Sequence, residues 1–129
     1  MRNWDKVNPN PKGKNIGDCV VRAICLAEGV EWERIYLDLC LQGYVMNDMP
    51  SSNDVWGTYL GNKGWTYHRL QDSCPFCYTI DDFCKDHPEG TFIVATGSHT
   101  VCVKDGRYLD TWDSGEKVPL FYFEKEKEQ

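Results

Sequence analysis

In the first half of the chain, apolar residues recur at the spacing of helix faces. The first such face follows a polar, extended lead-in over residues 1–17 and consists of Val20, Val21, Ile24, Cys25 and Ala27. It predicts a helix over 19–28, with Asp18 as its N-cap and Gly29 as its end. A second helix is predicted over 31–42, ended by Gly43, and its core stripe comprises Trp32, Ile35, Tyr36, Leu39 and Cys40.

A third helix is expected after a loop over 44–50. Ser51-Ser-Asn-Asp54 resembles a capping box, with Asp in place of the usual Glu. The residues that this helix is expected to bury are Val55, Trp56, Tyr59 and Leu60. A fourth, short helix is predicted to begin at the capping-box-like Thr79-Ile-Asp-Asp82 and to end at His87-Pro88, because proline disfavours helix at the residue before it.

The second half of the chain is dominated by strand patterns. Residues 65–70 alternate in polarity, whereas residues 91–96 are apolar enough to be buried on both faces. A last strand is predicted over 118–123, where Pro119 favours an edge position or the strand start, and a charged tail follows over 124–129. Helices followed by antiparallel strands predict one α+β domain over residues 1–129, with the helices on one side of the sheet.

A β-hairpin is predicted over 98–112, because two β-rich runs flank Asp105-Gly106, a dipeptide suited to a two-residue type I′ turn. That turn places His99 and Asp110 on one face as diagonal neighbours, roughly 7–8 Å apart at the backbone. A carboxylate reaches an imidazole nitrogen from there. Trp112 faces His99 and would shield the pair from water.

An imidazole that is oriented by a carboxylate can activate a nucleophile, and Cys19 is the best candidate. It falls in the first turn of the first predicted helix, where backbone N–H groups and the helix dipole favour a thiolate. The neighbouring Asp18 acts in the opposite direction. His68 is a second candidate base, but no Asp or Asn follows it at hairpin spacing, so we interpret it as a polar residue on a strand face.

This order of elements resembles the papain-like cysteine peptidase superfamily, which has a Cys at a helix start, a His on a later strand and an Asn or Asp on the next. Asp110-Thr111-Trp112 is similar to the Asn-Ser-Trp of papain-type enzymes, where Asn orients the histidine and Trp shields it. By this resemblance Cys19 would be the nucleophile, His99 the general base and Asp110 the orienting residue. The first helix would lie against the sheet, so that Cys19 meets His99.

The size of the chain and the string Gly17-Asp-Cys-Val-Val-Arg-Ala-Ile24 look more like small bacterial or phage papain-like proteins than papain itself. The family usually places a Gln before the Cys as an oxyanion donor, and no Gln precedes Cys19 here. Asn15 is the nearby side-chain amide that would serve, together with the backbone N–H of Cys19.

Four residues of the types that bind zinc form a competing candidate site, with the spacing C-x2-C-x6-C-x2-H: Cys74, Cys77, Cys84 and His87. They would make a zinc-stabilised interaction domain. A redox Cys-x-x-Cys lacks the βαβ setting that such motifs use, and free thiols are the remaining interpretation.

The composition limits the kinds of partner that the protein is expected to bind. The net charge of −6 leaves no basic stripe for nucleic acid, and no apolar run approaches the length of a membrane span. The N-terminus lacks the apolar region of a signal peptide, which predicts a cytoplasmic location, where seven cysteines are free thiols or metal ligands rather than disulfides.

The sequence therefore predicts a monomeric thiol hydrolase, of the cysteine peptidase or amidase kind, without a cofactor. It would act on an amide or isopeptide bond of a peptide or protein substrate through Cys19, His99 and Asp110, with Asn15. The alternatives are a catalytically inactive papain-like binding module and the zinc-stabilised domain.

Overall fold

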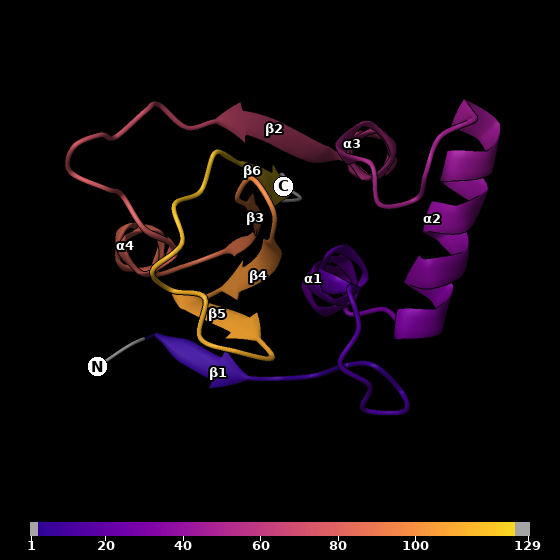
Figure 1. The fold of residues 1–129 in the computed structure, drawn as a ribbon, viewed down its shortest axis with the longest axis horizontal. Coiled ribbons are helices and arrows are strands. Elements are labelled where there is room, and N and C mark those ends of the chain that lie inside the picture. The colour runs from indigo at the N-terminus through magenta and orange to yellow at the C-terminus, as the bar shows by residue number, and fades with distance from the viewer. Residues whose placement is uncertain (1–2, 126–129) are drawn as a thin grey trace.

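The computed structural model describes residues 3–125, and its architecture is α+β, as the sequence predicts (Figure 1). The helices are α1 (Cys19–Glu28), α2 (Trp32–Met46), α3 (Asn53–Asn62) and α4 (Ile80–Asp86). The strands are β1 (Trp4–Lys6), β2 (Trp65–Arg69), β3 (Thr91–Ala95), β4 (Thr100–Lys104), β5 (Arg107–Asp110) and β6 (Phe121–Lys125).

The strands form one sheet in the order β1-β5-β4-β3-β6-β2. All described pairings are antiparallel except one, because β1 runs parallel to β5 with Trp4 opposite Tyr108. The expectation of an antiparallel sheet is therefore wrong for this one pair, and the predicted extended lead-in over 1–17 contains a strand. A strand of three residues is too short to show an alternating pattern, so the sequence carried no signal for it.

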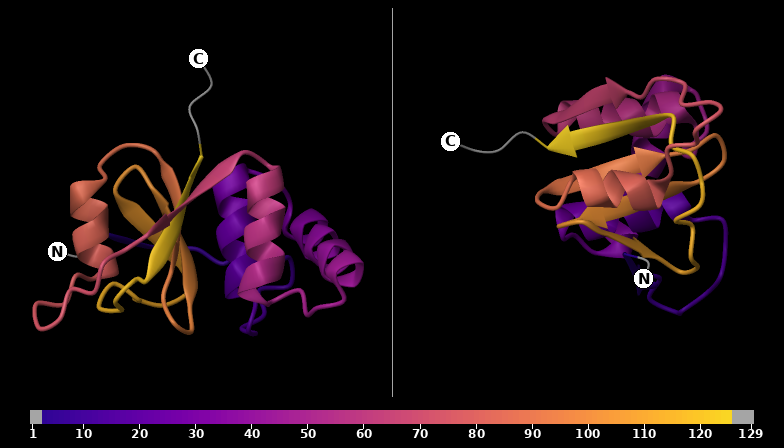
Figure 2. Two further views of the ribbon diagram at one scale, coloured as in Figure 1. Left: turned by 90° about the horizontal axis from the view of Figure 1, so that it is seen from above. Right: turned by 90° about the vertical axis from the view of Figure 1, so that its left-hand side faces the viewer.

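Helices cover both faces of the sheet, which corrects the prediction of a one-sided arrangement. Figure 2 shows α4 on one face and the other three helices on the opposite face, with α2 outermost. The central strands explain this arrangement, because a strand that is apolar on both faces needs cover on both. In β3, Ile93 packs into the cluster beneath α1 and α3, and Val94 packs into the cluster beneath α4.

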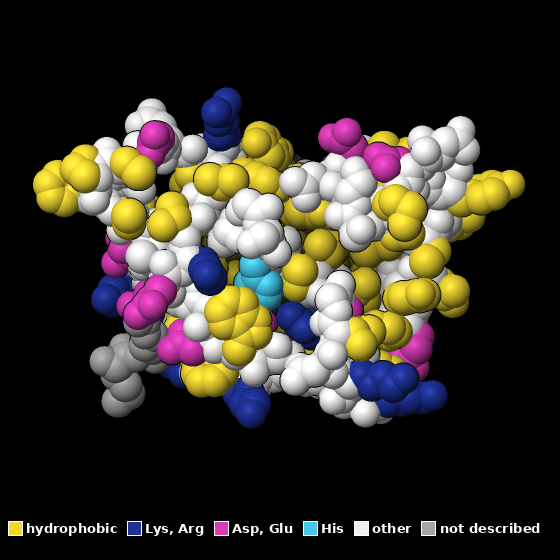
Figure 3. Space-filling view, viewed as in Figure 1, with side chains coloured by type: hydrophobic (Ala, Val, Ile, Leu, Met, Phe, Trp, Pro, Cys, Tyr) yellow, Lys and Arg dark blue, Asp and Glu magenta, His cyan; other side chains and the backbone are white. Residues whose placement is uncertain are grey.

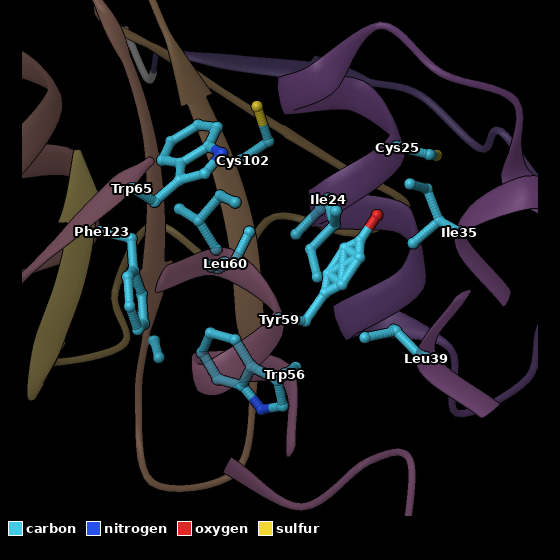
Figure 4. Packing of buried hydrophobic residues seen from close by; sticks show 13 residues of the cluster. Ile24, Cys25, Ile35, Leu39, Trp56, Tyr59, Leu60, Trp65, Cys102 and Phe123 are labelled. Carbon is cyan, nitrogen blue, oxygen red and sulfur yellow. The ribbon is translucent and has the colours of Figure 1, made fainter. Parts of the chain in front are cut away.

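The larger cluster joins α1, α2 and α3 to the sheet (Figure 4). Ile24 of α1 and Leu60 of α3 are fully buried in it. Removing a side chain of this size from water contributes about 1.5–3 kcal/mol. All the residues predicted to point inward from the third helix are buried, which fixes α3 against β2 and the sheet.

Helix α2 is longer than predicted and its core face is narrower. Gly43 does not end it, because the helix continues to Met46 and ends at Asn47 in the left-handed conformation. Gly43 is needed inside the helix, since a Cβ there would lie 2.7 Å from the carbonyl oxygen of Asp48. Tyr36 is 48 % exposed rather than part of the core, and its ring stacks on Trp32. Within residues 3–125, no helix is long and apolar enough to span a bilayer.

The last strand lies further along the chain than predicted. It covers 121–125 and is paired on both sides, with β3 and β2, so Pro119 precedes the strand and lies at no edge. Glu124 and Lys125 belong to this strand rather than to the predicted tail, and Lys125 pairs with Glu28 at 2.8 Å. The rest of the predicted tail, 126–129, lies outside the described residues.

Of the two capping boxes predicted from the sequence, the one at the start of α4 forms and the one at the start of α3 does not. Thr79 forms a capping box, in which its hydroxyl accepts from the backbone N–H of Asp82 and the Asp82 carboxylate accepts from the backbone N–H of Thr79. At α3 the N-cap is Ser52, and its side chain makes no capping bond, so the box predicted for 51–54 does not form.

The two caps make a matched pair of variants. We expect Thr79→Ala to lower the free energy of unfolding by about 1 kcal/mol, since an N–H of the first turn loses its acceptor. Ser52→Ala removes a hydroxyl that caps nothing, so its effect stays within about 0.5 kcal/mol. Urea unfolding followed by circular dichroism measures both. Equal losses in the two variants would contradict the assignment.

Candidate active site

Two turns bring together His99, which directly precedes β4, and Asp110, the last residue of β5. The β4–β5 turn is formed by Asp105 and Gly106 with φ angles of 49° and 78°, as the predicted type I′ turn requires. It pairs Lys104 with Arg107, which confirms the predicted register. Before β4, Thr96 fixes the backbone of His99 through bonds between the Thr96 N–H and the His99 carbonyl (2.7 Å) and between the His99 N–H and the Thr96 hydroxyl (3.0 Å).

The predicted contact between His99 and Asp110 is present. His99 Nε2 donates to Asp110 Oδ2 at 2.6 Å, and the ring of Trp112 lies 4.8 Å from the His99 ring. Asp110 is only 2 % exposed. Burial alone would raise the pKa of Asp110, but the hydrogen bonds from His99 and Ser114 outweigh it and the pKa is lowered. Asp110 is therefore a buried carboxylate in its ionised form.

Cys19 is the first residue of α1, and α1 packs against β4, so the thiol meets His99. Burial would raise the pKa of Cys19, yet the hydrogen bonds with His99 and with the backbone of Thr100 lower it below its ordinary value. For His99, burial acts to lower the pKa, while the bonds to Asp110 and Cys19 raise it to about 9. The two pKa values move in opposite directions, as a thiolate–imidazolium pair requires.

Asp18 stands at the N-cap position of α1, as predicted, but its side chain makes no capping bond. Its carboxylate instead accepts from Arg22 Nη1 at 2.8 Å and from Trp32 Nε1 at 2.9 Å. Arg22 is 6 % exposed, and its Nη2 lies 3.5 Å from Asp110 Oδ1. Arg22 is not among the site residues predicted from the sequence, although the i, i+4 spacing from Asp18 was a signal for the ion pair.

The loop after β5 supplies further donors to Asp110. The hydroxyl of Ser114 donates to Oδ2 at 2.6 Å and the backbone N–H of Thr111 donates to Oδ1 at 2.8 Å. Ser114 is 1 % exposed. No periodic pattern marks it, because it lies in an irregular loop, and sequence reasoning had no means of finding it.

Two hollows flank Cys19. The first, of about 480 Å³, is lined mainly by apolar side chains, among them Ile16, Val20, Tyr36 and Leu39. The second, of about 430 Å³, is lined by Asn15, Arg22 and Trp112 among others. Asn15 is exposed in the loop before α1, so the structure places this predicted residue at the border of the site. In Figure 3 a histidine lies in a hollow near the centre of the face, with apolar side chains beside it.

The four residues of the zinc hypothesis are not brought together. Cys84 is 2 % exposed, in the apolar cluster beneath α4, whereas Cys74 and Cys77 are exposed in the loop before that helix. His87 Nδ1 donates to the carbonyl of Phe83 at 2.8 Å. Over residues 3–125, no group of three or more His, Cys, Asp or Glu side chains is arranged to hold a metal ion.

His68, the second candidate base, lies on β2. It stacks on Tyr122, and its Nε2 is 3.4 Å from Glu124. The interpretation as a polar residue on a strand face fits these contacts.

The sequence matches no protein-family model, and comparisons with curated proteins and with solved structures found no match either. The functional inference therefore rests on the residues of the site.

The lowered pKa of Cys19 predicts how this residue reacts with iodoacetamide. At about pH 6, below the ordinary thiol pKa of about 8.5, we expect Cys19 to be carboxamidomethylated first among the cysteines. Peptide mass spectrometry measures the extent at each position. Cys25 is the internal control, because burial raises its pKa to about 11. Asp110→Asn should move the reactivity of Cys19 toward higher pH, and a titration of Cys19 near 8.5 in the wild-type protein would contradict the site.

The absence of an assembled metal site among the described residues predicts how the protein responds to metal removal. Because the described cysteines and histidines assemble no metal site, we expect EDTA to leave the Tm unchanged in a thermal melt. We also expect Cys77→Ser to leave the Tm unchanged, since Cys77 is exposed. Stoichiometric zinc that is lost in Cys77→Ser would restore the zinc hypothesis.

Proposed function

We propose that the protein is a small thiol hydrolase with a papain-like fold that cleaves an amide or isopeptide bond. One observation carries the proposal: His99 Nε2 lies 2.6 Å from the buried carboxylate of Asp110, and the same imidazole bonds to Cys19 at the start of α1. Each residue type has the role that the papain-like resemblance implies. Cys19 is the nucleophile, His99 the acid and base, and Asp110 the orienting residue.

The reaction divides into acylation and deacylation. Because Asp110 occupies Nε2, Nδ1 is the ring nitrogen of His99 that serves Cys19. The Cys19 thiolate attacks the carbonyl carbon, and His99 gives its Nδ1 proton to the leaving amine as the C–N bond breaks. A thioester remains on Cys19. Water then gives a proton to His99 and attacks the thioester, which releases the acid and restores the thiolate and the imidazolium.

The tetrahedral intermediates need donors for their oxyanion. The backbone N–H of Cys19 belongs to the first turn of α1, where N–H groups have no partner within the helix. Asn15 lines the hollow beside Cys19 and is the side-chain amide proposed to assist it in place of the missing Gln.

The substrate inferred from the first hollow is a peptide or protein segment with an apolar side chain near the scissile bond. The hollow opens beside Cys19, and its lining includes Val20, Tyr36 and Leu39. Asp18 also lines it, and its carboxylate is engaged by Arg22 and Trp32. Apolar contact is therefore among the interactions that this hollow offers a ligand.

The proposal predicts that Cys19→Ala abolishes hydrolysis of a fluorogenic peptide library varied in apolar residues, while circular dichroism stays unchanged. His99→Ala should reduce kcat by about 10²–10⁴-fold, because the leaving amine loses its acid. Wild-type activity should fall as the pH rises through about 9, where the pKa of His99 lies and its proton is lost. Cys74→Ala is the matched control, since this thiol is exposed in the loop before α4.

Hydrolysis that survives in Cys19→Ala would rule out the assignment. Selective alkylation of Cys19 without turnover of any library member would instead favour a binding module that retains a reactive thiol.

A further inference from the structure

We propose that Arg22 is a positioning residue of this site: held by Asp18, it fixes the carboxylate of Asp110 so that Oδ2 faces His99. The inference rests on the proposed function, because it assigns Arg22 a role within that site.

The hydrogen bonds of Asp110 divide between its two oxygens. Oδ2 accepts from His99 and Ser114, each at 2.6 Å. Oδ1 accepts from the backbone of Thr111 at 2.8 Å and faces Arg22 Nη2 at 3.5 Å. Of these donors, only Arg22 and His99 carry charge, and they lie at opposite oxygens. Rotation of the carboxylate would exchange these partners, so Arg22 helps to determine which oxygen His99 meets.

The guanidinium is itself held in place. Its Nη1 lies 2.8 Å from Asp18 Oδ1, and the other oxygen of Asp18 accepts from Trp32 of α2 at 2.9 Å. Asp18 and Arg22 are both buried, and each has 6 % of its surface exposed. The guanidinium of Arg22 is planar, with Nη1 bonded to Asp18 and Nη2 directed at Asp110, so it has little freedom to rotate.

Charges alternate along this row of side chains: Asp18, Arg22, Asp110, His99 and Cys19. The positive charge of Arg22 is also among the causes that lower the pKa of Cys19. From α2, the titratable side chains of Tyr36 and Cys40 line the first hollow together with Cys19. Loss of the Arg22 charge therefore acts on Cys19 directly, and it acts through Asp110 and His99 as well.

The test is the pH dependence of Cys19 alkylation by iodoacetamide, which requires no substrate. In Arg22→Gln we expect the midpoint to move to higher pH and the rate at about pH 6 to fall roughly tenfold, because a smaller fraction of Cys19 is then ionised. Arg22→Lys keeps the charge and should recover part of that rate. Ile24→Val is the control for stability, since it removes a buried methyl group from the same helix and leaves every charge in place.

Should Arg22→Gln fail to fold because Asp18 is left unpaired, the double variant Asp18→Asn/Arg22→Gln gives the same readout without a lone buried charge. If Cys19 keeps the wild-type alkylation midpoint in Arg22→Gln, or in the double variant where only that one folds, the inference about Arg22 is overturned. The assignment of a thiolate at Cys19 is unaffected by that result. A raised midpoint in a protein whose wild type hydrolyses nothing supports Arg22 and defeats the proposed function instead.

Discussion

The site depends on the burial of one carboxylate. Asp110 is 2 % exposed, and an ionised group in such a position is stable only when donors replace the water it has lost. Its donors come from separate parts of the chain: Arg22 on α1, His99 at the turn before β4, and Ser114 in the loop after β5. Among the described residues, every buried side-chain polar atom has a partner. The requirement to satisfy one carboxylate therefore ties α1 to the hairpin, which is the contact on which Cys19 and His99 depend.

The edge of the sheet supports this arrangement. Asp110 ends β5, and its own carbonyl oxygen accepts from the backbone N–H of Val7 at 3.0 Å and from Trp4 Nε1 at 3.2 Å. The short parallel strand β1 thus covers β5 where a free edge would expose the backbone of Asp110 to water. With that backbone fixed, the carboxylate meets His99 in one orientation, and the ring of Trp112 lies over the imidazole. The N-terminal segment, which has no pattern of its own, is in this way part of the site.

Local signals were sufficient for the hairpin and for α1, because Asp105-Gly106 fixes a register and a helix face follows from a run of about ten residues. They therefore predicted the contact of His99 with Asp110. They failed at Gly43, which lies inside α2 because the close approach of the Asp48 carbonyl requires a glycine there. They also failed where a partner distant in sequence decides the outcome, since β1 exists because β5 pairs with it. Arg22 was missed for the same reason, since its contact with Asp110 spans 88 positions.

Asp18 shows how the site overrides a local preference. An Asp at this position ordinarily caps the first turn, and that bond would stabilise the helix by about 1 kcal/mol. Here the carboxylate binds Arg22 and Trp32, so the Asp18 side chain does not cap α1. A capping carboxylate would lie beside the first-turn amides and oppose negative charge at Cys19. Paired with Arg22, the same carboxylate has its charge offset. Helix α1 therefore lacks this cap, while Cys19 keeps the positive charges of His99 and Arg22 nearby.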